Sequence, residues 1–191
     1  MLFESEEHDM DTYAVELNSF VDTVLTKVYD LGTGRNMIFS SFNPDICLLL
    51  SFKQPSIPIL FLSDAGTSPV GDIRASSLQE AIRFASRWNL LGVVSAAEPL
   101  VTCPRLIRVV KESGLVCVSY GTLNNNPRMV QRQAKEGIDA VIVDSVLAIR
   151  KELTAAQQKA GEQEQKQEPE PVIEVPQVVP TANGAKTNGH A

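Results

Sequence analysis

The sequence predicts a parallel α/β fold, and two observations support this prediction. First, five short apolar segments recur along the chain without alternating apolar and polar residues, as in strands that are buried on both faces. They cover residues 37–41, 59–62, 91–94, 116–120 and 140–143. Second, a stretch of helical character follows each segment, and this alternation is typical of parallel sheets.

Local signals place the helices between these strands. An amphipathic helix is predicted over residues 15–29, ahead of the first strand. Ser76 or Ser77 is expected to cap a later helix, and Gly114 and Gly137 are expected to follow the ends of two others. Proline suits the first position of a helix because the N–H that it lacks would be unpaired there. Three prolines are expected at such positions, each after a capping residue: Pro44 after Asn43, Pro104 after Thr102-Cys103, and Pro127 after Asn126.

Two architectures satisfy this pattern. Five parallel strands are enough for an open, doubly wound sheet, and they also make up part of an eight-stranded barrel. In both cases right-handed crossovers bring the loops that carry function to the C-terminal ends of the strands.

Composition narrows the class of protein. The formal net charge is −6 and the basic residues are scattered, which argues against a nucleic-acid surface. The three cysteines lie far apart, as expected in a reducing compartment. Residues 1–11 are acidic, unlike a signal peptide, and no apolar run approaches the roughly 20 residues of a membrane span. We therefore expect a cytoplasmic protein that neither binds nucleic acid nor spans a membrane.

A change in composition predicts two parts of the chain. From about residue 155 onward Gln, Glu, Lys and Pro replace the periodic apolar pattern. Such a segment has too few apolar residues to form a core. We expect a folded domain over residues 1–155 and a disordered tail over residues 156–191.

Five short motifs occur in a distinctive order. They read IFSSFNPDIC at 38–47, PILFLS at 58–63, LLGV at 90–93, GLV at 114–116 followed by Tyr120-Gly121, and EGIDAVIVD at 136–144. Together they resemble the C-terminal part of glycerophosphodiester phosphodiesterase domains, above all the eukaryotic glycerophosphocholine-cleaving branch, which includes fungal proteins. The resemblance covers about residues 1–153. It implies a (β/α)8 TIM barrel, of which this chain would form a partial barrel with strands four to eight.

The resemblance also implies a reaction, the hydrolysis of glycerophosphodiesters to glycerol 3-phosphate and an alcohol such as choline with the help of Mg²⁺ or Ca²⁺. In the family the chemistry depends on His-Arg-Gly, Glu-x-Asp and Glu-x-Lys motifs of the first three strands. None of the five predicted strands of this chain carries any of these motifs. We therefore expect a chain that begins after the third strand, holds no catalytic residues or metal ligands, and is inactive alone. Its two open sheet edges are expected to favour self-association.

Three residues are candidates for a substrate pocket: Phe42, Tyr120 and Asn125. Phe42 and Tyr120 lie at the C-terminal ends of predicted strands, and Tyr120 stands where the family usually has tryptophan, near an asparagine matched here by Asn125. An aromatic wall suits a choline-like group, partly through cation–π contact. Simple core packing is the alternative for the two rings. Asp144 belongs either to the site or to the cap of the following helix.

Other tempting residues receive ordinary interpretations. His8 lies in an acidic run and is expected to be solvent-exposed, and the segment 66–71 lacks the lysine of a phosphate-binding loop. A different class of function remains as an alternative: a non-catalytic α/β module that binds a partner or regulates a full-length relative.

Overall fold

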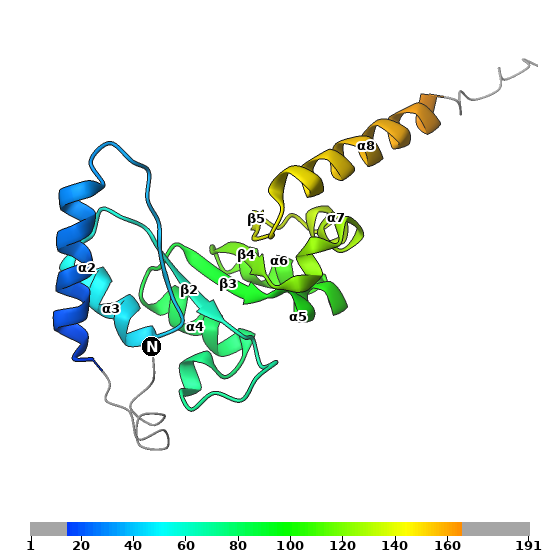
Figure 1. Cartoon of the computed structure of the whole chain (residues 1–191). Coiled ribbons are helices and arrows are strands. Elements are labelled where there is room, and N and C mark those ends of the chain that lie inside the picture. The colour runs from blue at the N-terminus through cyan, green and yellow to red at the C-terminus, as the bar shows by residue number, and fades with distance from the viewer. Residues whose placement is uncertain (1–14, 166–191) are drawn as a thin grey trace, which may run out of the picture. The chain divides into compact units, whose positions relative to one another are not determined.

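The computed structural model describes residues 15–165, and within them five strands form one parallel sheet (Figure 1). The strands are β1 (Phe39–Ser41), β2 (Ile59–Ser63), β3 (Gly92–Ala96), β4 (Val116–Tyr120) and β5 (Ala140–Val141). Every neighbouring pair is parallel, and the order in the sheet is the order in the chain. A doubly wound sheet reverses its strand order part-way, so the open-sheet alternative is excluded.

One described helix precedes the first strand, and helices follow all five strands. They are α2 (Leu17–Leu31), α3 (Pro44–Lys53), α4 (Leu78–Arg87), α5 (Ala97–Thr102), α6 (Arg105–Glu112), α7 (Pro127–Lys135) and α8 (Val146–Gln165), with 3₁₀ turns η1 (Ile73–Ala75) and η2 (Thr122–Asn125). The side chains of Asn43, Ser77 and Asn126 cap α3, α4 and α7 as the sequence predicts. Pro44 and Pro127 occupy first helical positions.

Two local predictions need correction. Pro104 lies at the N-cap of α6, one position earlier than expected. The short helix α5 was not predicted, because its first residues follow β3 directly and no side chain caps it. Gly114 and Gly137 do follow helix ends, and both have the positive φ angles, 77° and 85°, that favour glycine there.

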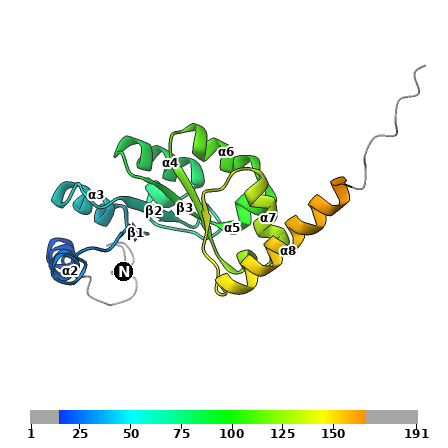
Figure 2. The same cartoon turned by 90° about the horizontal axis from the view of Figure 1, so that it is seen from above.

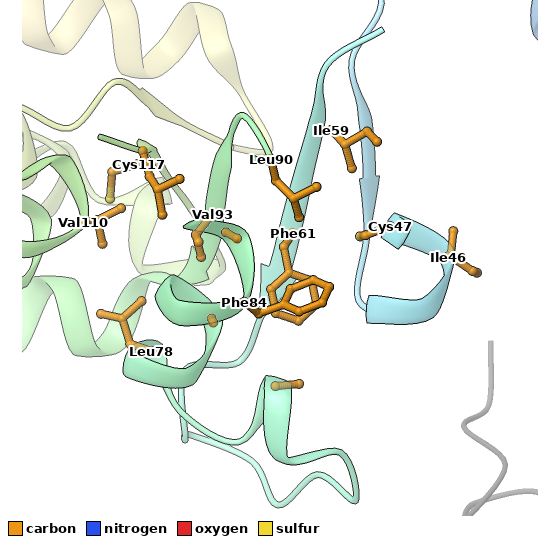
Figure 3. Packing of buried hydrophobic residues seen from close by; sticks show 14 of the residues in the cluster. Ile46, Cys47, Ile59, Phe61, Leu78, Phe84, Leu90, Val93, Val110 and Cys117 are labelled. Atoms are coloured by element: carbon orange, nitrogen blue, oxygen red, sulfur yellow. The ribbon is translucent and has the colours of Figure 1, made fainter. Parts of the chain in front are cut away.

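The main core lies between the sheet and the helices. The contacts of α3 and α4 with β2, and of α6 with β4, bring these helices onto the sheet (Figure 2). Phe61 of β2 is fully buried against Phe84 of α4, with ring centroids 4.9 Å apart (Figure 3). Val93 and Cys117 continue the same face on β3 and β4. We call this side the helix face.

The opposite side of the sheet, which we call the inner face, carries a much smaller cluster. It contains Leu60, Val94 and Val118 with partly buried neighbours such as Leu62 and Tyr120, all from the strands. Because side chains alternate along a strand, the residues just outside the strands, Ile38, Phe42 and Ile142, belong to the same face. All three are exposed, by 57%, 46% and 52%. A sheet with helices along one face and apolar side chains on the other is the wall of a barrel.

β3 and β4 approach closely at one point. Gly92 faces Val116, and a Cβ atom at Gly92 would lie 2.1 Å from the Val116 carbonyl oxygen. Glycine is therefore required here by the neighbouring backbone rather than by its own dihedral angles.

The chain divides into two units, residues 1–155 and 156–191. Helix α8 begins in the first unit and continues to Gln165, so helical structure extends into the segment expected to be disordered. The remainder of that segment, with His190, lies outside the described residues, as does His8. The predicted tail over residues 156–191 stays a prediction. No helix between residues 15 and 165 has the length and apolar character needed to cross a membrane.

Candidate functional site

The inner face ends in a group of three side chains at the C-terminal ends of the strands: Phe42 after β1, Asp64 after β2 and Tyr120 at the end of β4. Asp64 continues the alternation of Leu60 and Leu62, which turns its carboxylate to the inner face. We call these three residues the inner-face corner.

Phe42 and Tyr120 meet edge to face. Their ring centroids are 5.8 Å apart and the rings are inclined by 84°, a favourable arrangement for an aromatic pair. β1 and β4 are three strands apart in the sheet order, a spacing of about 14 Å in a flat sheet. The contact therefore shows that the inner face is concave at its C-terminal edge, as in a barrel.

Tyr120 also joins Asp64, two strands away. The phenol O–H donates a hydrogen bond to Asp64 Oδ1. The strand between them, β3, pairs Ala96 with Tyr120, and this small side chain leaves room for the phenol to pass. Burial, and then the hydrogen bond to Asp64 and its negative charge, raise the pKa of Tyr120 well above its usual range. Tyr120 is therefore a neutral donor at physiological pH.

Asn125, the third predicted pocket residue, has its contacts elsewhere. Its Nδ2 donates to Asp144 Oδ2 at 2.5 Å, and its Oδ1 accepts from the Asp144 backbone N–H at 3.0 Å. Both residues are exposed. The pair links η2 to the loop after β5 at the surface of the molecule. The two candidate residues Asn125 and Asp144 are thus hydrogen-bonded to each other.

A buried polar network positions these loops, and sequence reasoning missed it. Ser119, Asn124 and Gln133 are fully buried. Ser119 Oγ donates to Gln133 Oε1 at 2.6 Å, Asn124 Nδ2 donates to Ser119 Oγ at 3.0 Å, and Gln133 Nε2 donates to Asn124 Oδ1 at 2.9 Å. Asn124 also donates to the Ile142 carbonyl at 3.1 Å. The network therefore holds β4, η2, α7 and the segment after β5 in one arrangement.

A second unpredicted group fixes the loop between β2 and α4. Arg74 reaches Asp45 Oδ1 at 2.6 Å and Asp72 Oδ2 at 2.5 Å, and its guanidinium lies 5.8 Å from the Phe84 ring centroid. The hydrogen bonds from Arg74 lower the pKa of Asp72. These ion pairs connect α3 to η1 and so hold the loop that follows Asp64.

The described residues offer little catalytic chemistry. Between residues 15 and 165, no three His, Cys, Asp or Glu side chains gather as a metal ion would require, and the sequence has no histidine in this range. Burial raises the pKa of the Cys47 and Cys117 thiols to about 12, which keeps both protonated and unreactive.

Comparison with known proteins decides the family. Residues 2–148 match the Glycerophosphoryl diester phosphodiesterase family. The chain belongs to this family. It is 61% identical over 160 residues to the protein named "Glycerophosphocholine phosphodiesterase GDE1" of Eremothecium gossypii, and 60% identical over 154 residues to the protein of the same name from Candida albicans. These matches cover 84% and 80% of this chain but only 12% and 13% of the two relatives, so the chain spans about an eighth of their length.

Solved structures confirm the fold class. A glycerophosphodiester phosphodiesterase from Parabacteroides distasonis superposes with a TM-score of 0.57 at 14% identity, and covers 74% of this chain and 53% of its own. A phosphodiesterase from Oleispira antarctica, solved with the product sn-glycerol-3-phosphate, gives 0.54 at 15% identity, with 74% and 50% covered. Since about half of each solved chain is matched, the prediction of a partial (β/α) barrel is confirmed.

The family generally depends on a metal ion. The described residues do not fit such a site, because no three of their His, Cys, Asp or Glu side chains converge.

Proposed function

We propose that this chain forms the C-terminal wall of a glycerophosphodiester phosphodiesterase barrel and binds the alcohol side of the substrate. The single observation that carries the proposal is the family match over residues 2–148, on a sheet whose C-terminal edge bears the inner-face corner. The fungal relatives are named as glycerophosphocholine phosphodiesterases, which favours a choline ester as substrate.

The proposed reaction is hydrolysis of the bond between phosphorus and the alcohol oxygen. Water adds to phosphorus, that bond breaks, and the leaving oxygen takes up a proton, giving glycerol 3-phosphate and choline. The product bound by the Oleispira antarctica phosphodiesterase supports this outcome. Groups outside the described residues are proposed to bind Mg²⁺ or Ca²⁺ and to transfer protons, and this chain alone is proposed to be inactive.

Within this reaction we assign two roles. Phe42 and Tyr120 present aromatic surface to the head group, and the alternative of simple core packing is less favourable because Phe42 remains 46% exposed. Asn125, through its pair with Asp144, orients the loop at the rim. The cytoplasmic location stays a prediction.

A chimera tests this function. Residues 1–155 of this chain replace the matching segment of the Candida albicans relative, and choline release from glycerophosphocholine is measured with Mg²⁺ or Ca²⁺. We expect the chimera to hydrolyse the substrate and the isolated chain not to. A chimera that folds but hydrolyses no glycerophosphodiester would overturn the proposal.

A second candidate function is a binding module that pairs with another half-barrel or a second copy. β1 and β5 each have a single neighbour in the sheet, and Ile38 and Ile142 beside them are exposed. Sedimentation of the purified chain discriminates. A stable dimer that forms without any hydrolytic partner favours the module.

A further inference from the structure

We propose that Asp64 is a specificity-determining residue, the negative charge that binds a quaternary ammonium head group lying against the edge-to-face pair of Phe42 and Tyr120. This inference rests on the proposed function and deepens it, since it assigns a residue to the choice between cationic and uncharged alcohols. No motif of the sequence pointed to Asp64, and its place at the site follows from the contact with Tyr120.

The charge of Asp64 has no cationic partner among the described side chains. Four aspartates among the described residues form ion pairs with lysine or arginine: Asp22, Asp45, Asp72 and Asp139. Asp64 forms no such ion pair among residues 15–155, whose side chains the structure describes, and the partner of its carboxylate there is the neutral phenol of Tyr120. The negative charge of Asp64 is therefore not neutralised by the side chains described.

The carboxylate of Asp64 is held in a fixed position. Asp64 is half-buried, and the turn after it is tightly held. The Asp64 carbonyl accepts hydrogen bonds from the Thr67 N–H at 3.0 Å and the Thr67 hydroxyl at 2.8 Å, and Ala65 N–H donates to Ser63 Oγ at 3.0 Å. Ala65 has a φ of 54°, a left-handed conformation that costs free energy in a residue other than glycine.

The surroundings of Asp64 suit an organic cation. A quaternary ammonium group donates no hydrogen bond, so proteins bind it through aromatic rings and negative charge. The inner-face corner supplies both within the reach of one small cation, two rings 5.8 Å apart and the carboxylate bonded to one of them. Donation of the Tyr120 proton toward Asp64 also polarises the phenol, which strengthens the attraction of its ring for a cation.

A metal ion does not explain the same residues. Asp64 belongs to no group of three or more His, Cys, Asp or Glu side chains among residues 15–165. A divalent cation binds several oxygen ligands, whereas one carboxylate with two aromatic rings fits an organic cation.

The test is a titration of the chain itself, followed by the backbone amide NMR signals of the inner-face corner. Choline is compared with 3,3-dimethyl-1-butanol, an uncharged molecule of the same shape. We expect choline to shift these signals at about tenfold lower concentration than the uncharged analogue. The variant Asp64→Asn should lose this preference. Asp64→Glu, which keeps the charge, should retain it, and the control Asp30→Asn, an exposed change on α2, should behave as the wild type.

A third variant separates charge from structure, because Tyr120→Phe removes the hydrogen bond but leaves the carboxylate in place, whereas Asp64→Asn removes the charge and keeps an oxygen that can accept the bond. If Asp64 binds the cation, Tyr120→Phe keeps the preference for choline over the uncharged analogue even where both bind more weakly. The inference is overturned if Tyr120→Phe loses the preference as fully as Asp64→Asn, or if the wild type binds both molecules equally.

The chimera distinguishes failure of this inference from failure of the proposed function. With the wild-type segment, the ratio of kcat/KM for glycerophosphocholine to that for glycerophosphoglycerol is measured, and Asp64→Asn should lower this ratio about tenfold. Hydrolysis of both substrates with an unchanged ratio leaves the function intact and rejects the role of Asp64. A folded chimera that hydrolyses neither substrate rejects the function itself.

Discussion

The two faces of the sheet differ in how they are completed. The helix face is covered by α3, α4 and α6, which contact the strands, and Phe61, Val93 and Cys117 are almost fully buried there. The inner face has three buried residues, Leu60, Val94 and Val118, and exposes Ile38, Phe42 and Ile142 at its margins. Apolar surface that is buried stabilises the fold, and apolar surface that stays exposed is available for binding. The difference indicates that the helix face contributes more to stability, and the inner face is the one that we propose for recognition.

The largest expected effect is on the helix face. Phe61→Ala removes a fully buried ring that packs on Phe84, and should lower the free energy of unfolding by about 3–5 kcal/mol. The matched inner-face change, Val118→Ala, should cost only about 1–2 kcal/mol. Urea unfolding followed by circular dichroism measures both. Equal losses would contradict the comparison between the faces.

The junction of β3 and β4 should be sensitive to a single methyl group. In Gly92→Ala the new Cβ would lie 2.1 Å from the Val116 carbonyl oxygen, so the strands must separate, at a cost of about 1–3 kcal/mol. Gly34→Ala is a useful contrast, because a Cβ there meets no atom within 4 Å and any loss comes from its positive φ of 80°. The same urea titrations test the pair, and a neutral Gly92→Ala would show that the strands adjust freely.

Acid should lower the free energy of unfolding through Asp72, in the loop between β2 and α4. Hydrogen bonds from Arg74 lower the pKa of this carboxyl below its ordinary value of 3.8. The folded state therefore favours the charged form, so this stabilisation is present above the ordinary pKa and is lost as the pH falls through the lowered one. We expect the urea midpoint to fall from about pH 5 downward, and to fall less in Asp72→Asn. Parallel curves for the two proteins would refute the role of Asp72.

The smallest expected effect on stability lies at the inner-face corner. Phe42→Ala removes a 46% exposed ring with an edge-to-face contact to Tyr120, and should lower the free energy of unfolding by only about 0.5 kcal/mol. In the choline titration the same variant should weaken choline binding by about threefold or more. A large loss of stability, with choline binding unchanged, would assign Phe42 to core packing.

Features that involve residues close together in the sequence were predictable. Features that depend on residues far apart in the sequence were not. The caps at Asn43, Ser77 and Asn126 each involve residues two or three positions away, and the sequence predicted them. The family motifs led to the partial barrel. Asn125 was assigned to the pocket, a role that stays a proposal, and its bond to Asp144 across 19 residues was not expected. No periodic pattern in the sequence marks the network of Ser119, Asn124 and Gln133. The run of three asparagines at 124–126 is the one local feature that could have indicated a polar cluster.

The sequence by itself determined the strands, the caps, the parallel alternation and the family, because apolar periodicity, capping side chains and motif order are local or ordered along the chain. Only the tertiary structure decided that Phe42, Asp64 and Tyr120 meet. Tyr120 and Asp64 are 56 residues apart in sequence, and their contact depends on the curvature of the sheet and on a small residue, Ala96, in the strand between them. The contact of a side chain across an intervening strand depends on the geometry of the sheet, which no short segment of the sequence contains.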